Sequence, residues 1–159
     1  MNNGLIISTW DYLYGVVVQC NQSIDKLTEL KEMDPDNEYF DIYKAEVRAI
    51  RAMYYYYLLD MFARVPIVES SLTQMKDVKQ SERSEVFNFV KKELEESIPL
   101  LVDEKSAAQG EYYGRMTKAA AYFLMAKLAL NAEVYTDNDW TDQSRPDGKN
   151  IMFTVDGTE

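Results

Sequence analysis

The sequence of 159 residues contains no histidine, and this absence excludes several kinds of catalytic site. Ser-His-Asp and Cys-His nucleophile systems, histidine zinc sites and Glu-x-x-His di-iron bundles all need an imidazole. The single cysteine, Cys20, cannot form an internal disulfide, and its place in an apolar helical stripe predicts a small buried side chain. We therefore predict no catalytic residue, no metal site and no cofactor.

Basic residues are also scarce, because 17 Lys and Arg face 27 Asp and Glu and leave a net charge of −10. DNA, RNA or an anionic membrane surface would repel such a chain, since Lys and Arg supply the affinity for phosphates. We expect no nucleic-acid partner. The apolar run Leu5–Ile7 has no basic flank and is too short for a signal-peptide core or a membrane span.

Only 6 Gly and 4 Pro occur, and the prolines stand at the edges of long periodic stretches, which predicts an all-α fold. Within these stretches apolar residues recur at steps of three and four, the spacing of one helical face. Ser84 and Thr117 are the expected N-caps of the last two helices. The predicted helices span about 8–31, 40–62, 84–98 and 117–135, with a polar connection at 67–81.

The helix predicted at 40–62 carries large residues on one side and alanines on another, and the helix at 117–135 repeats this division. Aligning Ala45 with Ala119 also aligns Ala52 with Ala126, an offset of 74 residues. Alanine-rich second helices packed on aromatic first helices are typical of tetratricopeptide-like hairpins. We expect close helix contacts at Ala45, Ala49 and Ala52 and at Ala120, Ala126 and Ala129. The prediction is one helical domain, or a fragment of a larger one, over 1–159, with hairpins at about 8–136 and an irregular tail at 137–159.

Two groups of acidic residues are candidates for other chemistry. An EF-hand loop that starts at Asp137 would need Gly in place of Asp142 and Glu in place of Gly148, so we do not predict calcium binding. The acids of the third helix are interpreted as an exposed helical face rather than as an acid/base pair, because no polar pocket is implied around them. These are Glu93, Glu95 and Glu96.

Four phrases of the sequence have an order and spacing that resemble one family. They are Trp10-x-x-Leu13-Tyr14, Glu46-x-Arg48-x-x-Arg51-Ala52-x-x-Tyr55 followed by Phe62-Ala63-Arg64-Val65-Pro66, Arg83-Ser84-Glu85-Val86-Phe87, and Gly114-Arg115-Met116-Thr117. Together they resemble the SusD/RagB family, helical outer-membrane lipoproteins of Bacteroidetes that help to capture glycans and other nutrients. The similarity covers about residues 8–136, an early part of a typical member, so the chain is expected to be a fragment.

The resemblance implies a SusD-like superhelix of helical hairpins and a function. The expected function is a nutrient-binding component, with glycans as the nutrient, of an uptake system on the surface of the outer membrane. The implied partners are a SusC-like TonB-dependent transporter and an oligosaccharide or other nutrient. Members of the family carry a lipidated N-terminal cysteine that this chain does not contain, and Cys20 cannot replace it because it lies within the first helix.

The signature residues themselves are interpreted as structural. Arg48 and Arg51 lie on other sides of their helix than the main aromatic stripe, with Glu46 near enough to share a polar network that fixes helix docking. Contact with a ligand is the alternative role. At Ala63 the family usually has Gly, which suits a left-handed helix end, so we expect a strained or altered termination there.

Sugar binding needs exposed aromatic rings beside carboxylates or amides, because rings cover the apolar sugar faces and polar groups take the hydroxyls. The aromatic residues outside the helical stripes are Tyr112, Tyr113 and Trp140, and these are the predicted glycan-binding residues. Trp140 suits packing at the start of a further helix equally well. The connection at 67–81, which contributes to carbohydrate binding in some relatives, contains no aromatic residue.

Two other functions compete with nutrient binding. A general helical-repeat module for protein–protein interaction fits the packing pattern alone. A carboxylate-driven hydrolase has no support beyond the number of acids. Within the family interpretation we also expect the helical array to serve as a docking surface, with ligand capture depending largely on parts outside this chain.

Overall fold

The computed structural model describes residues 3–103 and 110–155, so the end of the predicted tail at 156–159 lies outside the described residues. Within these ranges all named secondary-structure elements are helices, joined by loops, and Pro66 and Gln80 form an isolated antiparallel bridge, which confirms the all-α prediction. The elements are α1 (Gly4–Met33), α2 (Tyr39–Phe62), α3 (Arg83–Ser97), α4 (Lys118–Leu130) and α5 (Ala132–Tyr135), with 3-10 turns at Met75–Asp77, Ile98–Leu100 and Gly148–Asn150.

The helix starts follow local hydrogen bonding. The N-cap of α3 is Glu82 and not Ser84. The Glu82 side chain accepts from the Glu85 backbone N–H, and the Glu85 carboxylate accepts from the Glu82 backbone N–H at 2.7 Å. This reciprocal box satisfies two backbone donors at once, which explains why the helix starts one residue before Ser84. Thr117 stands at the N-cap position of α4 as predicted, but its hydroxyl is buried and has no hydrogen-bond partner in the described part of the chain.

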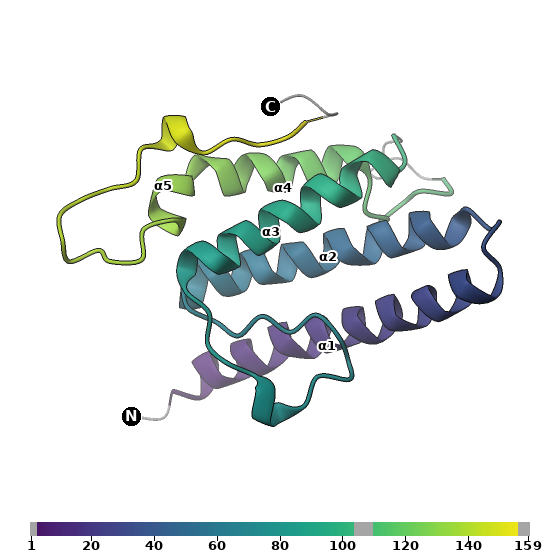
Figure 1. Ribbon diagram of the computed structural model, residues 1–159, viewed down its shortest axis with the longest axis horizontal. Helices are drawn as coiled ribbons and strands as arrows, with labels where there is room; N and C mark the ends of the chain where they lie inside the picture. The colour runs from purple at the N-terminus through teal and green to yellow at the C-terminus, as the bar shows by residue number, and fades with distance from the viewer. Residues whose placement is uncertain (1–2, 104–109, 156–159) are drawn as a thin grey trace.

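The helices form a layered array in which α2 lies between α1 and α3, and α4 lies beyond α3 (Figure 1). The alanine face of α2 is buried as predicted, and its small side chains let the neighbouring helices approach closely. The core of α2 and α3 is completed by large side chains that are almost fully enclosed, among them Tyr55, Leu58, Phe87, Val90 and Leu94.

The alanines of α4 contradict the predicted repeat. Ala126 and Ala129 are exposed, and so are Phe123 and Leu130 near them. The helix instead buries Ala121, Leu124, Met125 and Leu128. Its packed face is therefore the large one, and the prediction of close contacts at Ala126 and Ala129 is wrong for the described structure.

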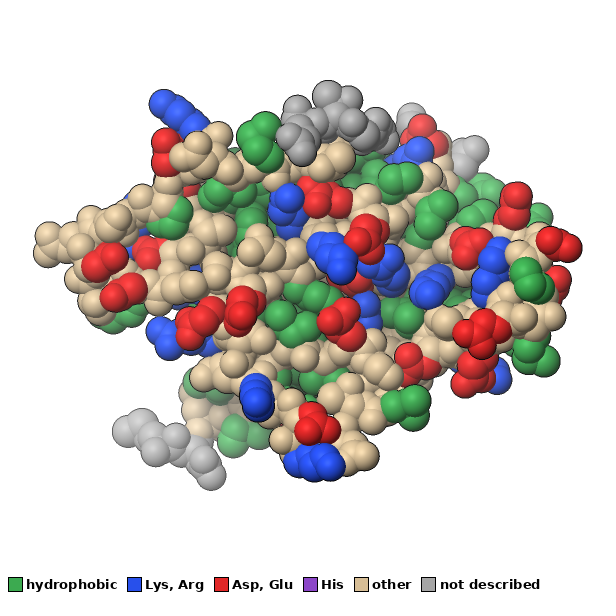
Figure 2. Space-filling model, viewed as in Figure 1, with side chains coloured by type: hydrophobic (Ala, Val, Ile, Leu, Met, Phe, Trp, Pro, Cys, Tyr) green, Lys and Arg blue, Asp and Glu red, His purple; other side chains and the backbone are tan. Residues whose placement is uncertain are grey.

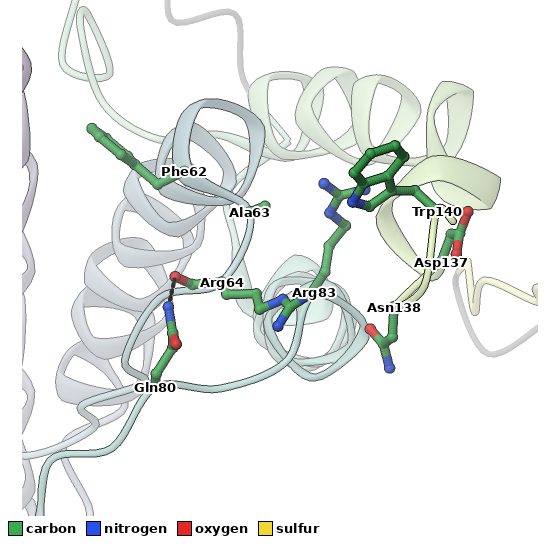
Figure 3. A pocket seen from close by; sticks show the side chains of 8 residues that line it. All are labelled: Phe62, Ala63, Arg64, Gln80, Arg83, Asp137, Asn138 and Trp140. Carbon is green, nitrogen blue, oxygen red and sulfur yellow. Dashed lines mark hydrogen bonds between the residues drawn. The ribbon is translucent and has the colours of Figure 1, made fainter. Parts of the chain in front are cut away.

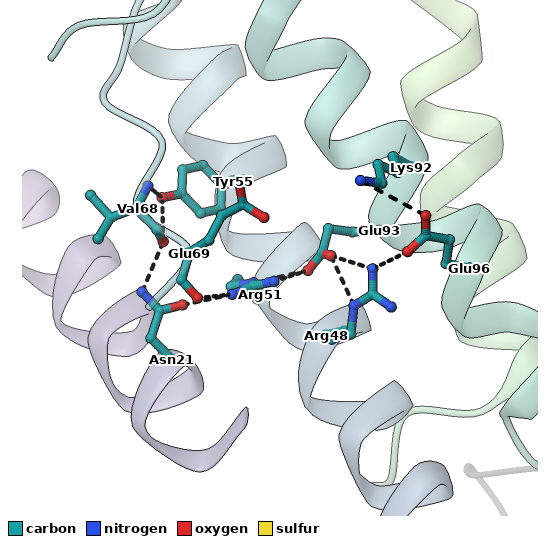
Figure 4. Close-up of polar contacts among 9 residues, drawn as sticks. All are labelled: Asn21, Arg48, Arg51, Tyr55, Val68, Glu69, Lys92, Glu93 and Glu96. Carbon is teal, nitrogen blue, oxygen red and sulfur yellow. Dashed lines mark hydrogen bonds and ion pairs between the residues drawn. The ribbon is translucent and has the colours of Figure 1, made fainter. Parts of the chain in front are cut away.

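A buried carboxylate joins α2 to α3. Glu93 is 2% exposed, although the sequence analysis placed it on an exposed face, so that prediction is wrong. One of its oxygens accepts from Arg48 Nε at 2.9 Å, and the other accepts from Arg51 Nε at 2.8 Å (Figure 4). Two guanidinium groups thus surround one carboxylate, which is the arrangement that makes burial of a charge tolerable.

The same network extends to α1 and to the segment that connects α2 and α3, which we call the 63–82 loop. Arg51 Nη1 donates to Asn21 Oδ1 at 2.8 Å and to the carbonyl of Glu69 at 2.9 Å (Figure 4). Asn21 in turn donates to the carbonyl of Val68 at 2.8 Å. Arg51, on α2, therefore contacts α1, α3 and the 63–82 loop.

Acidic side chains gather around the turn between α1 and α2 on the face drawn in Figure 2, away from this buried network. Asp34, Asp36 and Glu38 are exposed there, where water screens their mutual repulsion. None of the described helices is at once long enough and apolar enough to cross a membrane.

We predict that Glu93→Gln lowers the free energy of unfolding by about 3 kcal/mol, because it leaves Arg48 and Arg51 without their shared counter-charge. Glu96→Gln on the same helix is the matched control. Glu96 also pairs with Arg48, at 2.6 Å, but its side chain is 47% exposed, so the expected loss is under about 1 kcal/mol. Urea unfolding followed by circular dichroism measures both values, and equal losses would contradict the buried clamp.

Candidate functional site

A hollow of about 390 Å³ lies where the end of α2, the start of α3 and the segment after α5 meet. We call it the Trp140 pocket. Figure 3 shows the side chains of Arg64 and Arg83 extending into the space between the end of α2 and Trp140. The lining residues are Phe62, Ala63, Arg64, Gln80, Arg83, Asp137, Asn138 and Trp140.

The end of α2 gives one wall of this pocket its shape. Ala63 has φ 62° and ψ −74°, and Arg64 N donates to the carbonyl of Phe62 at 2.8 Å. These values define a γ-turn of the rare, strained class, which L-residues with a Cβ adopt at a cost. The expected strained termination at Ala63 is thus confirmed, and the turn directs the Arg64 side chain into the pocket.

The segment 136–145 forms the opposite wall, and its own side chains hold it. Asp137 Oδ1 accepts from the Asp139 backbone N–H at 3.0 Å, and Asp139 Oδ1 accepts from the Thr141 N–H at 3.0 Å. Such turns, in which an Asp side chain bonds the backbone two residues on, stabilise loops without a helix or strand. The hydroxyl and N–H of Thr141 also keep the pKa of Asp139 below its usual value.

The segment is anchored to α3 by one amide side chain. The Ser84 backbone N–H donates to Asn138 Oδ1 at 3.0 Å, and Asn138 Nδ2 donates to the Ser84 hydroxyl at 2.8 Å. Trp140 follows two residues later in a turn and is 67% exposed, so it does not begin a packed helix in the described structure. The anchored turn therefore presents an indole ring to solvent beside two arginines.

The other two predicted glycan-binding residues lie far from Trp140. Tyr112 is half-buried beneath the guanidinium of Arg115, 5.2 Å from its ring centroid, and Tyr113 is 65% exposed. Arg115 pairs with Glu46 on the first half of α2, whereas Phe62 at the pocket ends that helix. Sixteen helical residues separate these two positions by about 24 Å, so the structure does not bring the three aromatic residues together.

The remaining signature residues stabilise the fold. Tyr55 OH accepts from the Val68 N–H at 2.8 Å, and burial raises the pKa of Tyr55 to about 12. The carbonyl of Pro66 accepts from Tyr14 OH at 2.6 Å. Gly114, at φ 73°, allows the turn before α4 that brings Arg115 to Glu46.

The sequence analysis missed Arg64, Gln80 and Arg83 as pocket residues. Arg64 and Arg83 stand within the quoted phrases, and Gln80 lies three residues before Arg83. Their spacing does not distinguish them from ordinary polar residues of the surface. The sequence analysis also named Trp10 and Tyr14 only as part of the first quoted phrase and predicted no hollow beside them. The structure places both rings along a second, largely apolar hollow of about 390 Å³, between α1 and the 63–82 loop.

A family model described as SusD-like, starch-binding and associating with the outer membrane matches residues 1–130. The chain belongs to this SusD-like family. The starch-binding protein SusD of Bacteroides thetaiotaomicron is 34% identical over 93 residues, which cover 58% of this chain. These matches confirm the resemblance that the four phrases indicate.

Solved structures show the same SusD-like fold. A laminarin-binding SusD-like protein superposes with a TM-score of 0.67 at 26% identity over 81% of this chain. A SusD homologue from Bacteroides thetaiotaomicron gives a TM-score of 0.69 at 24% identity over 83% of it. The chain spans 16% of the curated SusD protein and 28% and 26% of these two structures.

We predict that Ala63→Gly raises the free energy of unfolding by about 1 kcal/mol, because glycine adopts a positive φ without the steric cost of a Cβ. Ala49→Gly in the buried middle of α2 is the control, and it should lower stability because glycine disfavours a helix interior and leaves a gap. Urea unfolding compares the two variants. A loss of stability in Ala63→Gly would show that the turn carries no strain.

Proposed function

We propose that this protein is a nutrient-binding component of an outer-membrane uptake system and that the Trp140 pocket contacts a glycan. The exposed indole of Trp140, beside the polar side chains of Arg64 and Gln80, is the observation that carries this proposal. Sugar rings have apolar faces that stack on aromatic rings and hydroxyls that need polar partners. The pocket supplies both kinds of contact within one small volume.

The pocket has the donors and acceptors that hydroxyl groups need. Gln80 Nε2 donates to the carbonyl of Arg64 at 3.0 Å, and this hydrogen bond orients the Gln80 amide beside the hollow. Arg64 is half-exposed beside Glu82, its Nε lying 3.5 Å from that carboxylate. With one aromatic ring and an open shape, the isolated pocket should bind a neutral sugar with a Kd of about 1 mM, equal to about 4 kcal/mol.

Family membership supports the location and the partner that go with this function. The family is described as associating with the outer membrane. For this protein we propose a place on the outer-membrane surface, held there by a lipid anchor, and a SusC-like TonB-dependent transporter as partner. Leu72 and Met75 on the 63–82 loop are 83% and 87% exposed beside the apolar hollow lined by Trp10, and exposed apolar patches of this kind mark docking surfaces.

The proposed role is binding without catalysis. Two relatives are described as binding proteins, one starch-binding and one laminarin-binding. A general interaction module of helical repeats has no observation in its favour that SusD-like membership does not explain equally well.

Isothermal titration of the chain with starch, laminarin and xyloglucan oligosaccharides tests the pocket. We expect millimolar binding of at least one glycan, and we expect Trp140→Ala to weaken it about tenfold or more, because the stacking surface is lost. Tyr113→Ala removes an equally exposed ring elsewhere and should leave binding unchanged. Loss of binding in Tyr113→Ala and not in Trp140→Ala would place the site at the other end of the molecule.

A further inference from the structure

The arginines of this acidic chain are almost all paired with carboxylates. Five of the six lie within 4.0 Å of a carboxylate oxygen, and these are Arg48, Arg51, Arg64, Arg115 and Arg145. Arg83 is the exception in the described part of the chain. An unpaired, half-buried arginine is unusual in a protein with ten excess negative charges, because acidic partners are abundant on its surface.

Arg83 has one hydrogen bond that fixes its direction without neutralising it. Its Nη1 donates to the carbonyl of Val134 at 3.1 Å. Figure 3 shows the guanidinium group beside the ring of Trp140. A guanidinium carries five N–H donors in a planar fork, so this single bond leaves donors for a second acceptor. The side chain is thus held in place and remains chemically available.

The acids near Arg83 already have partners. Asp137, which lines the pocket, is ion-paired with Arg145. Glu82 lies beside Arg64, with Nε and Oε2 3.5 Å apart. The Asp139 carboxylate accepts from both the N–H and the hydroxyl of Thr141. The positive charge of Arg83 is therefore the one in the pocket that no ion pair within the described residues offsets.

We propose that the Trp140 pocket selects a sugar that carries a carboxylate, the uronic acid residue of an acidic glycan. This inference rests on the proposed sugar-binding function and names its ligand class. Arg83 binds the carboxylate through its planar fork, which matches two carboxylate oxygens. Trp140 covers the apolar face of the same or the adjacent sugar ring.

The net charge of −10 means that a preference for an acidic sugar has to arise in the pocket and not from the overall charge of the protein. Long-range repulsion disfavours any polyanion that approaches this protein, so a preference for an acidic sugar needs a direct local contact. A carboxylate is a better acceptor for a guanidinium than a hydroxyl or an ester carbonyl, because both partners are charged. The charge of the sugar, and not its shape alone, should therefore decide the affinity.

The test titrates the chain with trimers of galacturonate, mannuronate and glucuronate, each compared with its own uncharged methyl ester. We expect at least one acid to bind about tenfold or more tightly than its ester. Arg83→Gln should abolish this difference, so that each acid and its own ester bind within about twofold of each other. Lys92→Gln, which makes the same change of charge at an exposed site on α3, should keep the full preference.

Arg83→Lys separates charge from geometry. It keeps the positive charge but lacks the planar fork, so the preference for the acid should fall to about threefold. An unchanged circular dichroism spectrum would show that both Arg83 variants are folded.

The inference is overturned if every acid binds no better than its ester, or if Arg83→Gln keeps the preference. Neutral glycan binding that depends on Trp140 but shows no preference for acids would refute this inference and leave the proposed function standing. If the acids, their esters and the neutral oligosaccharides all fail to bind, both the inference and the proposed function fail.

Discussion

The carboxylate of Glu93 is the point on which the arrangement of the first three helices depends. It comes from α3, it is buried, and two guanidinium groups of α2 surround it, while Arg51 reaches on to α1 and the 63–82 loop. Apolar packing would allow neighbouring helices to slide with little change in buried area. A buried charge requires its partners at fixed distances, so the clamp selects one register between α2 and α3.

This register matters for the pocket because its walls are the ends of the clamped helices. Phe62 lies eleven residues beyond Arg51 on α2, and Arg83 lies ten residues before Glu93 on α3. Both distances are about 15 Å along antiparallel helices, so a fixed register holds the two walls opposite each other. The bond between Asn138 and Ser84 then attaches the Trp140 turn to the same framework.

The helices could be predicted from sequence because periodicity is a local property. The structure confirms the first three, whereas the predicted helix at 117–135 breaks at Asn131 into α4 and α5. The burial of Glu93 could not be predicted, because two arginines on another helix decide it, 42 and 45 residues away. Trp140 is a candidate from sequence because it stands outside every stripe, but packing at the start of a further helix was an equal alternative, and only the structure shows its ring exposed. Its pocket was not recognised, since it depends on contacts such as that between Ser84 and Asn138, 54 residues apart. The exposure of Ala126 shows that a small-residue pattern does not say which face a neighbour covers.

The chain contains two tryptophans, and the structure places them in different hollows, Trp10 beside the 63–82 loop and Trp140 in the proposed sugar pocket. Their indole N–H signals in a nuclear magnetic resonance spectrum of the labelled chain therefore report separately on the two sites. During titration with a uronate trimer that binds, the account predicts a progressive, saturating shift of the Trp140 signal while the Trp10 signal stays fixed. A shift of Trp10 with an unchanged Trp140 would contradict it.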